Sequence, residues 1–355
     1  MKKRKLSVKI ILIIALCFII VGCIGCTIIT LELYSQAYGR VEEFSEMYEF
    51  STYFFWDDMD QNKYTREEVF FNSGGNKLQG FIYGESNING LVIISQGMGS
   101  TADCYLPLVM YFVDNGWRVF AYNNTGVAGS EGEGIRGLTQ SVIDLDAALI
   151  YVKNSGKFSG LPIMLIGHSW GGFAVTAVLN YNHDVKASVS FAGYNNSRER
   201  FKEAAVIELG GIFYVLSPQT WAIEKQLFGD TAKLNAIDGI NKANIPVIIV
   251  QSSNDDEVLP NTTSIYAHRN KITNPYVEIV YLEGEDAAGH EFVCCSKEQR
   301  EYMKWADASW EVYEKNNTGA SRLKWAEEIN FDKFKANELN MELFDRINIF
   351  FNNAR

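Results

Sequence analysis

Short apolar segments alternate with segments of helical periodicity along most of this chain. Six runs of mostly apolar residues are expected to be strands: 91–95, 118–122, 163–166, 187–191, 247–250 and 277–281. A strand pair is also expected within residues 69–83, around the turn signal Ser73-Gly-Gly-Asn76. Helices are expected near residues 103–115, 138–154, 171–181, 297–314 and 337–352. Strands without a polar face that alternate with helices predict an α/β fold, with a mostly parallel sheet flanked by helices.

The N-terminus has a different pattern. Residues 2–5 are all basic, and an almost uninterrupted apolar run extends from Ile10 to Leu31. These roughly 22 residues would form a helix of about 33 Å, long enough to cross a bilayer as an N-terminal transmembrane helix. The basic cluster is expected to stay in the cytoplasm, which places the rest of the chain outside the cell membrane. There are two alternatives: a cleaved secretory signal and a lipoprotein signal that ends at Cys23. Both would also export the remaining chain.

Three further segments lie outside the alternating pattern. Residues 32–64 mix polar and aromatic side chains, including Tyr48, and are expected to form a juxtamembrane linker or helix. An insert at about residues 195–240 is too long for an ordinary loop and is a candidate helical cap. The expected division is therefore a membrane anchor over 1–31, the linker over 32–64, a main domain with the cap over 65–295, and a C-terminal helical extension over 296–355.

Composition narrows the function classes. The chain has 355 residues and a net charge of −11, with no basic stripe beyond the extreme N-terminus. This argues against binding to nucleic acid. Three of the six cysteines fall in the apolar run, and the spacing of Cys104, Cys294 and Cys295 is not that of a metal site. We therefore expect no metal and no organic cofactor, and the composition leaves the oligomeric state open.

The most informative stretch is Gly167-His168-Ser169-Trp170-Gly171, which follows a predicted strand and precedes a predicted helix. A serine at the apex of such a strand–turn–helix is a nucleophile elbow. The sharp turn strains the backbone at the serine, so the positions two before and two after it need almost no side chain. The Gly-x-Ser-x-Gly pattern alone is weak evidence, and the flanking elements are what make Ser169 a candidate nucleophile.

A nucleophilic serine requires a base, and the base requires an acid that orients it. Of the four histidines, His290 is the candidate base because it follows the last predicted strand. Active sites of open α/β sheets form at this carboxyl edge. His168 lies inside the elbow and is expected to point away from the reaction, whereas His183 and His268 lie in polar segments.

The candidate acid lies in the loop after the strand at 247–250, where Asp255 and Asp256 are adjacent. Both are plausible partners for the base. Aspartates in such a loop also cap turns and helices. One of them is therefore expected to orient His290 and the other to stabilise the turn.

An oxyanion formed at Ser169 would need two hydrogen-bond donors. One is expected to be the backbone N–H of Trp170, directly after the nucleophile. The other is expected to be the N–H of Met98, in the loop Ser95-Gln-Gly-Met-Gly-Ser100 after an early strand. The glycine-rich run at 124–134 lacks the lysine of a phosphate-binding loop and is interpreted as a structural loop beside the site.

Together these residues resemble the α/β-hydrolase superfamily over roughly residues 65–295. Within it, residues 97–144 and 167–172 resemble membrane-anchored hydrolases of the lysophospholipase-like and serine aminopeptidase-like branches. The resemblance assigns Ser169 as nucleophile, Asp255 as acid, His290 as base, and Met98 and Trp170 as oxyanion donors. This chain departs from the family where Gln96 precedes Gly97 in place of a histidine, and where residues 123–126 read Asn-Asn-Thr-Gly in place of Asp-x-Arg-Gly.

The resemblance implies a serine hydrolase that transfers an acyl group to water. The apolar N-terminus and the aromatic cap favour a carboxylic ester substrate with an apolar acyl group, such as a lipid or lysophospholipid. A serine aminopeptidase-like enzyme is the alternative, with Glu203, Glu208 and Glu224 as candidate ligands for a substrate amine. An anchored binding protein without catalysis is the third interpretation.

Overall fold

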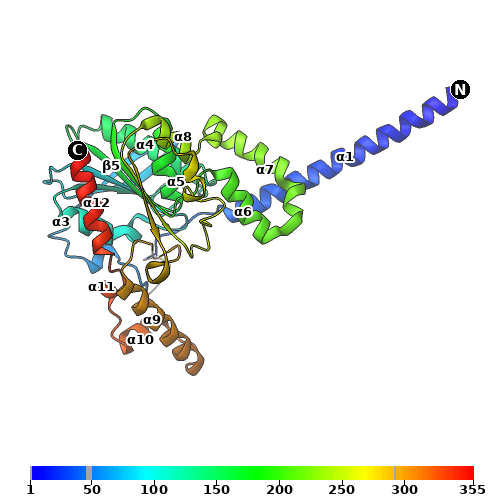
Figure 1. The fold of residues 1–355 in the computed structure, drawn as a ribbon. Coiled ribbons are helices and arrows are strands. Elements are labelled where there is room, and N and C mark those ends of the chain that lie inside the picture. Colours follow the sequence, from blue (N-terminus) through cyan, green and yellow to red (C-terminus); the bar gives the residue numbers. More distant parts are fainter. Residues whose placement is uncertain (1, 45–49, 292) are drawn as a thin grey trace.

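An eight-stranded sheet forms the centre of the molecule, in the order β1-β2-β4-β3-β5-β6-β7-β8 (Figure 1). The strands are β1 (Arg66–Ser73), β2 (Asn76–Tyr83), β3 (Leu91–Ser95), β4 (Arg118–Tyr122), β5 (Ile163–His168), β6 (Val185–Phe191), β7 (Val247–Ser252) and β8 (Val277–Leu282). The computed structural model describes residues 2–44, 50–291 and 293–355, and in the first helix it describes the side chains from residue 10 onward except 11 and 19. Tyr48 of the expected linker therefore lies outside the described residues.

The sheet is mostly parallel, as the apolar strands predict. β2 pairs antiparallel with β1 and with β4, whereas every pairing from β4 through β3 to β8 is parallel. The antiparallel pair β1–β2 is joined by the tight turn at Ser73–Asn76, as expected. The carboxyl ends of the parallel strands consequently meet at one edge of the sheet, where the loops that follow them can converge.

Both faces of the sheet are buried at β3 to β7, which explains why these strands lack a polar face, whereas the edge strand β1 has an exposed face. In β3, Leu91 and Ile93 belong to one core cluster and Val92 and Ile94 to the other, because successive side chains of a strand point to opposite faces. The first cluster packs under α4, α5 and α8, and the second under α3 and α12.

The helices outside the sheet are α1 (Lys2–Ala37), α3 (Leu106–Asp114), α4 (Gln140–Asn154), α5 (Trp170–Ala177), α6 (Ser197–Leu209), α7 (Phe213–Phe228), α8 (Ala236–Ala243), α9 (Lys297–Asn316), α10 (Arg322–Glu328), α11 (Lys333–Ala336) and α12 (Met341–Ala354). The α6 and α7 helices stand away from the sheet beside α1, whereas α8 packs on α5 (Figure 1). The α9 and α10 helices project from the body around a small core at Trp325. The central sheet, its flanking helices and the apolar N-terminal helix confirm the predicted fold class.

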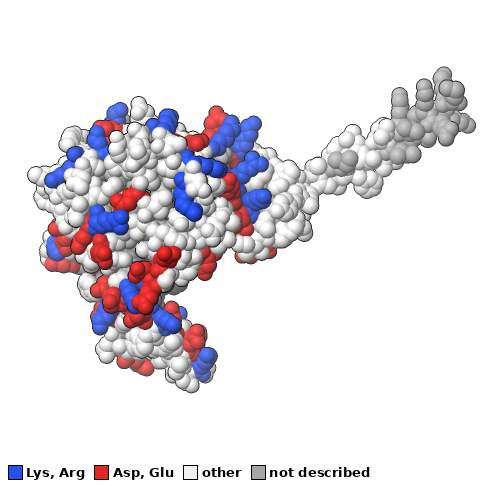
Figure 2. Space-filling model, in the orientation of Figure 1, with Lys and Arg blue, Asp and Glu red and all other residues white. Residues whose placement is uncertain are grey.

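The first helix combines an apolar, exposed part with a base that is fixed to the body. Its segment Leu12–Ala37 is long and apolar enough to cross a membrane. Figure 2 shows the part of this helix that projects from the body without charged side chains among its described residues, in contrast to the body. After the helix, Gly39 and Val41 form bridges with Gly134 and Val127. The segment that follows α1 is therefore joined by backbone contacts to the loop between β4 and α4.

Candidate active site

Ser169 occupies the sharp turn between β5 and α5. Its backbone angles are φ 54° and ψ −111°, a conformation that non-glycine residues rarely adopt. Its N–H donates to the carbonyl of Phe191, 2.8 Å away. A side chain at Gly171 would place its Cβ 1.9 Å from the Ser95 carbonyl oxygen, and one at Gly167 would lie 2.3 Å from the Gly171 carbonyl oxygen. The two glycines are thus required by close backbone approach, and the strained turn presents Ser169 at the sheet edge.

Three loops at this edge bring Ser169, His290 and Asp255 into one line. The Ser169 hydroxyl lies 2.9 Å from Nε2 of His290. Nδ1 of His290 lies 3.0 Å and 3.1 Å from the two carboxylate oxygens of Asp255. The serine follows β5, the aspartate follows β7 and the histidine follows β8. In this geometry Asp255 can hold the Nδ1 proton, which leaves Nε2 free to accept the serine proton.

The two adjacent aspartates point in different directions. Asp255 is only 3% exposed, and it accepts hydrogen bonds from the N–H groups of Glu257 (3.1 Å) and Val258 (2.8 Å) and from the Gln251 amide (2.8 Å). Asp256 is exposed to solvent. The structure therefore brings Asp255, and not Asp256, to His290.

This chain is similar to one protein family and to several solved structures. A family model described as "Serine aminopeptidase, S33" matches residues 86–236. Two crystal forms of the Pyrococcus furiosus esterase Pf2001 are similar at 17% identity and a TM-score of 0.51; they cover 72% and 78% of this chain and 95% and 98% of the esterase. The α/β hydrolase GrgF from Penicillium sp. sh18 has a TM-score of 0.47 at 19% identity, over 64% of this chain and 92% of that one. Comparison with curated proteins finds no match.

The chain has the α/β-hydrolase fold. The fold implied by the resemblance of the elbow and its neighbouring motifs is thus confirmed. In this fold the loop after β3 faces the elbow across the sheet edge.

In this chain that loop carries Met98. The Gly97 N–H donates to the Tyr105 hydroxyl at 2.7 Å, and the Gln96 amide donates to the Ser100 carbonyl at 2.7 Å. Gln96, which stands where relatives have a histidine, therefore stabilises the loop by a hydrogen bond between its two ends. Within the described part of the chain, the N–H groups of Met98 and Trp170 donate to no protein acceptor. This is what the prediction of two oxyanion donors requires of them.

The second departure from the family pattern is stabilised by a buried carboxylate. Asp144 accepts from the Thr125 N–H (2.8 Å), the Gln140 amide (2.8 Å) and the Ser73 hydroxyl (2.7 Å). Asn123 accepts from the Ala102 N–H at 2.7 Å. The loop at residues 123–126 is thus fixed without the arginine of its relatives.

His168 has a role that the sequence analysis missed. The Tyr105 hydroxyl, which accepts from Gly97, lies 3.1 Å from Nδ1 of His168, and Nε2 of His168 lies 3.1 Å from the carbonyl of His290. Burial, together with the neighbouring His290, lowers the pKa of His168 to about 3. A neutral His168 that donates from Nε2 and accepts at Nδ1 satisfies every hydrogen bond in the series from Gly97 through Tyr105 and His168 to His290. His168 therefore connects the Met98 loop to the backbone of His290, and its place inside the elbow was the only signal in the sequence.

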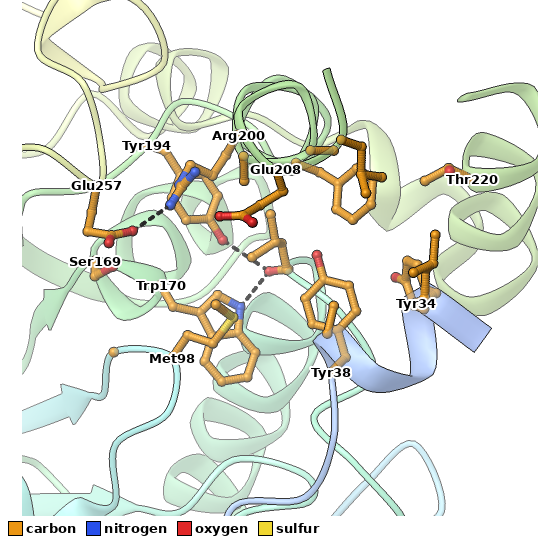
Figure 3. Close-up of a pocket in the computed structure, with 18 of the residues that line it drawn as sticks. Tyr34, Tyr38, Met98, Ser169, Trp170, Tyr194, Arg200, Glu208, Thr220 and Glu257 are labelled. Atoms are coloured by element: carbon orange, nitrogen blue, oxygen red, sulfur yellow. Dashed lines mark hydrogen bonds and ion pairs between the residues drawn. The ribbon is translucent and has the colours of Figure 1, made fainter. Parts of the chain in front are cut away.

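An apolar pocket of about 330 Å³ lies beside Ser169. Its walls come from the Met98 loop, α6 and α7 of the cap, and the end of α1. Figure 3 shows Ser169 at one end and Tyr34 and Thr220 at the other. Near the serine, Arg200 pairs with Glu257 at 3.0 Å. The pocket thus offers a polar end at the nucleophile and an apolar remainder.

The glutamates proposed from the sequence to hold an amine lie in three different settings. Glu203 accepts from the hydroxyls of Thr262 and Thr263 and does not line the pocket. Glu224 is buried, accepts from the Tyr34 hydroxyl, and has its pKa raised by burial. Glu208 lines the pocket, where Glu257 and Glu291 also lie. In the described ranges no group of three or more His, Cys, Asp and Glu side chains is arranged to hold a metal ion.

Proposed function

We propose that this chain is a membrane-anchored serine hydrolase that cleaves carboxylic esters through an acyl-enzyme on Ser169. The observation that carries the proposal is the continuous line of hydrogen bonds from Ser169 through His290 to the buried Asp255. An aligned serine, imidazole and carboxylate next to two unengaged backbone N–H groups can perform acyl transfer. The hydrolase fold, the family-model match and the esterase fold neighbour support this chemistry.

In the proposed mechanism, His290 takes the proton of Ser169 as its oxygen attacks the ester carbonyl. The oxyanion accepts hydrogen bonds from Met98 and Trp170, each typically contributing a few kcal/mol to the transition state. The carbon–oxygen bond to the alcohol breaks, and His290 returns the proton to the leaving oxygen. Water then gives a proton to His290 and attacks the acyl-enzyme, which releases the acid and regenerates the serine hydroxyl.

The pocket supports an apolar acyl group. Beyond the polar end at Ser169, its lining includes Phe201, Leu209, Phe213 and Leu216 of the cap. Pockets that bind apolar ligands combine such walls with a few polar groups that fix orientation. A lipid or lysophospholipid ester has the matching division into a polar linkage and a hydrocarbon chain.

The anchor proposal depends on α1. The large apolar side chains that the structure describes before Thr30 are exposed, and the basic residues 2–5 favour a cytoplasmic N-terminus. We propose a single-pass helix with the catalytic domain outside the cytoplasm. Mass spectrometry of the membrane fraction tests this: an intact N-terminus supports the anchor, an N-terminus at a lipidated Cys23 supports a lipoprotein, and a shorter soluble form supports a cleaved signal.

The function is tested with p-nitrophenyl esters of graded chain length, aminoacyl-p-nitroanilides and a fluorophosphonate probe. Ester turnover and probe labelling that are both lost in Ser169→Ala are expected. Ester turnover that survives this substitution would refute Ser169 as nucleophile. Failure of the probe to label the wild-type protein would favour a binding protein without catalysis.

An aminopeptidase-like activity is the second candidate, and one observation favours it. Glu208, Glu257 and Glu291 all line the pocket that contains Ser169. Carboxylates so placed could hold the amine of a peptide, although Arg200 already pairs with Glu257. Turnover of the anilides without turnover of the esters would establish this alternative.

A further inference from the structure

The base of α1 is a wall of the substrate pocket. Thr30, Leu33, Tyr34 and Ala37 line it together with the cap helices. The Tyr34 hydroxyl donates to the buried carboxylate of Glu224 on α7, so the contact between the two helices is specific. The end of a candidate membrane helix is therefore built into the site of reaction.

The bilayer surface falls at the level of this pocket. A hydrocarbon core of about 30 Å takes roughly 20 helical residues. Counted from Ile10, these end near Leu31. Leu31 is exposed, whereas its neighbours Thr30 and Leu33 line the pocket. Since α1 is continuous from Lys2 to Ala37, a bilayer around this span would end where the pocket begins.

The cap presents a second apolar surface on the same side. Residues 207–215, here called the α6–α7 corner, expose four large apolar or aromatic side chains: Ile207, Ile212, Tyr214 and Val215. This corner lies beside α1, on the side toward which α1 projects (Figure 1), and its one charged residue is Glu208, which also lines the pocket. Exposed apolar residues with an aromatic ring are typical of segments that rest in a membrane interface. Leu209 of the corner also lines the pocket, so the apolar surface continues into the site.

We propose that the pocket is loaded from the bilayer: the corner rests in the membrane surface, and the acyl chain of a membrane-resident ester enters between α1 and the corner. This rests on the proposed ester hydrolysis at Ser169 and on the anchor. The occupant of the corner is the lipid surface, because the corner adjoins the helix that spans it. The acyl chain then passes from lipid to the pocket without crossing water, while the ester group meets the polar end near Ser169.

The first test uses the full chain in phosphatidylcholine vesicles with two substrates. One is p-nitrophenyl palmitate dissolved in the vesicles, and the other is p-nitrophenyl butyrate in the surrounding water. The variant Ile212→Glu/Val215→Glu places two carboxylates on the corner without touching the pocket lining. The matched control is Ile349→Glu on α12, since Ile349 is 61% exposed and Ile212 is 62% exposed.

The corner variant is expected to hydrolyse the vesicle ester at least tenfold more slowly and the soluble ester within twofold of wild type. The control should leave both rates unchanged. Equal loss on both substrates would overturn the proposal, because the corner would then act on the site itself. Unchanged turnover of the vesicle ester would overturn it as well.

The second test does not depend on catalysis. A tryptophan introduced by Ile212→Trp is expected to be quenched by brominated phosphatidylcholine, and one introduced by Ile349→Trp is not. Absence of quenching at residue 212 would overturn bilayer contact. If wild type hydrolyses neither ester and the fluorophosphonate leaves Ser169 unlabelled, the proposed function fails, whereas the quenching result still decides whether the corner meets the membrane.

Discussion

Replacing Asp255 by asparagine removes the charge that faces His290 and keeps the size of the side chain. The carboxylate now holds the Nδ1 proton at 3.0 Å and accepts from the backbone of Glu257 and Val258. An asparagine that keeps the backbone contacts through its oxygen must turn its NH₂ group toward Nδ1. The imidazole then favours the tautomer with its proton on Nε2, which cannot accept the proton of Ser169. The corresponding change in a serine protease lowers kcat about 10⁴-fold, which is roughly 5.5 kcal/mol of transition-state stabilisation.

The matched control is Asp256→Asn, because Asp256 is the exposed neighbour in the same loop. We expect kcat/KM for p-nitrophenyl butyrate to fall by about four orders of magnitude in Asp255→Asn, and to stay within twofold in Asp256→Asn. Thermal unfolding of both variants separates loss of catalysis from loss of fold. Retention of more than a tenth of the wild-type rate in Asp255→Asn, or an equal loss in Asp256→Asn, would refute the assignment of the acid.

Three further outcomes are expected. Gly171→Ala should abolish folding, measured as soluble yield and thermal unfolding, because its Cβ would lie 1.9 Å from the carbonyl oxygen of Ser95; Gly211→Ala, with open space around it, should fold normally. Burial lowers the pKa of His168 to about 3, so below pH 6.5 the folded chain binds fewer protons than the unfolded chain. The free energy of unfolding should therefore fall by up to about 1.4 kcal/mol per pH unit as the pH is lowered from 6.5 toward 3. His168→Gln should remove this contribution to the slope. Burial raises the pKa of Glu224, so the free energy of unfolding should fall as the pH rises above 4.5. Denaturant titrations at several pH values measure this fall. If Glu224→Gln shows the same pH dependence as wild type, Glu224 is not its source.

Much of the fold was accessible from sequence because the sheet is buried on both sides. The apolar runs at 91–95 and 118–122 coincide with β3 and β4 in both bounds. The predicted runs for β5 and β7 stop two residues short, because these strands end at the polar residues His168 and Ser252, whose backbone still pairs with the neighbouring strand. Hydrophobicity alone therefore cannot locate the end of a strand whose last residues are polar.

The packing of α1 on the cap could not be predicted. Apolar residues that face lipid and apolar residues that face a pocket give the same pattern along a helix. Tyr34 and Glu224 are also 190 positions apart, and neither lies in a recognisable motif. Their contact is a product of the assembled fold.

The candidate site also contains residues that could be predicted from the sequence and residues that could not. Ser169 and His290 were identifiable because backbone geometry and strand order constrain them, and the structure brings them together. The choice between Asp255 and Asp256 depends on which of two adjacent side chains turns inward. His168 occupies a position that the elbow leaves free, so no pattern separates a connecting histidine from any other residue there.

The last helix has a consequence for how the molecule is made. Phe344, Ile347 and Phe351 of α12 are completely buried, and Asn348 accepts from the Trp117 indole at 2.8 Å. The part of this sheet face that α12 covers therefore stays uncovered while the ribosome adds residues 283–354, roughly 4–15 s at ordinary rates of synthesis. The nascent polypeptide must be shielded from aggregation during that interval, and its maturation is necessarily completed after translation of the final turn.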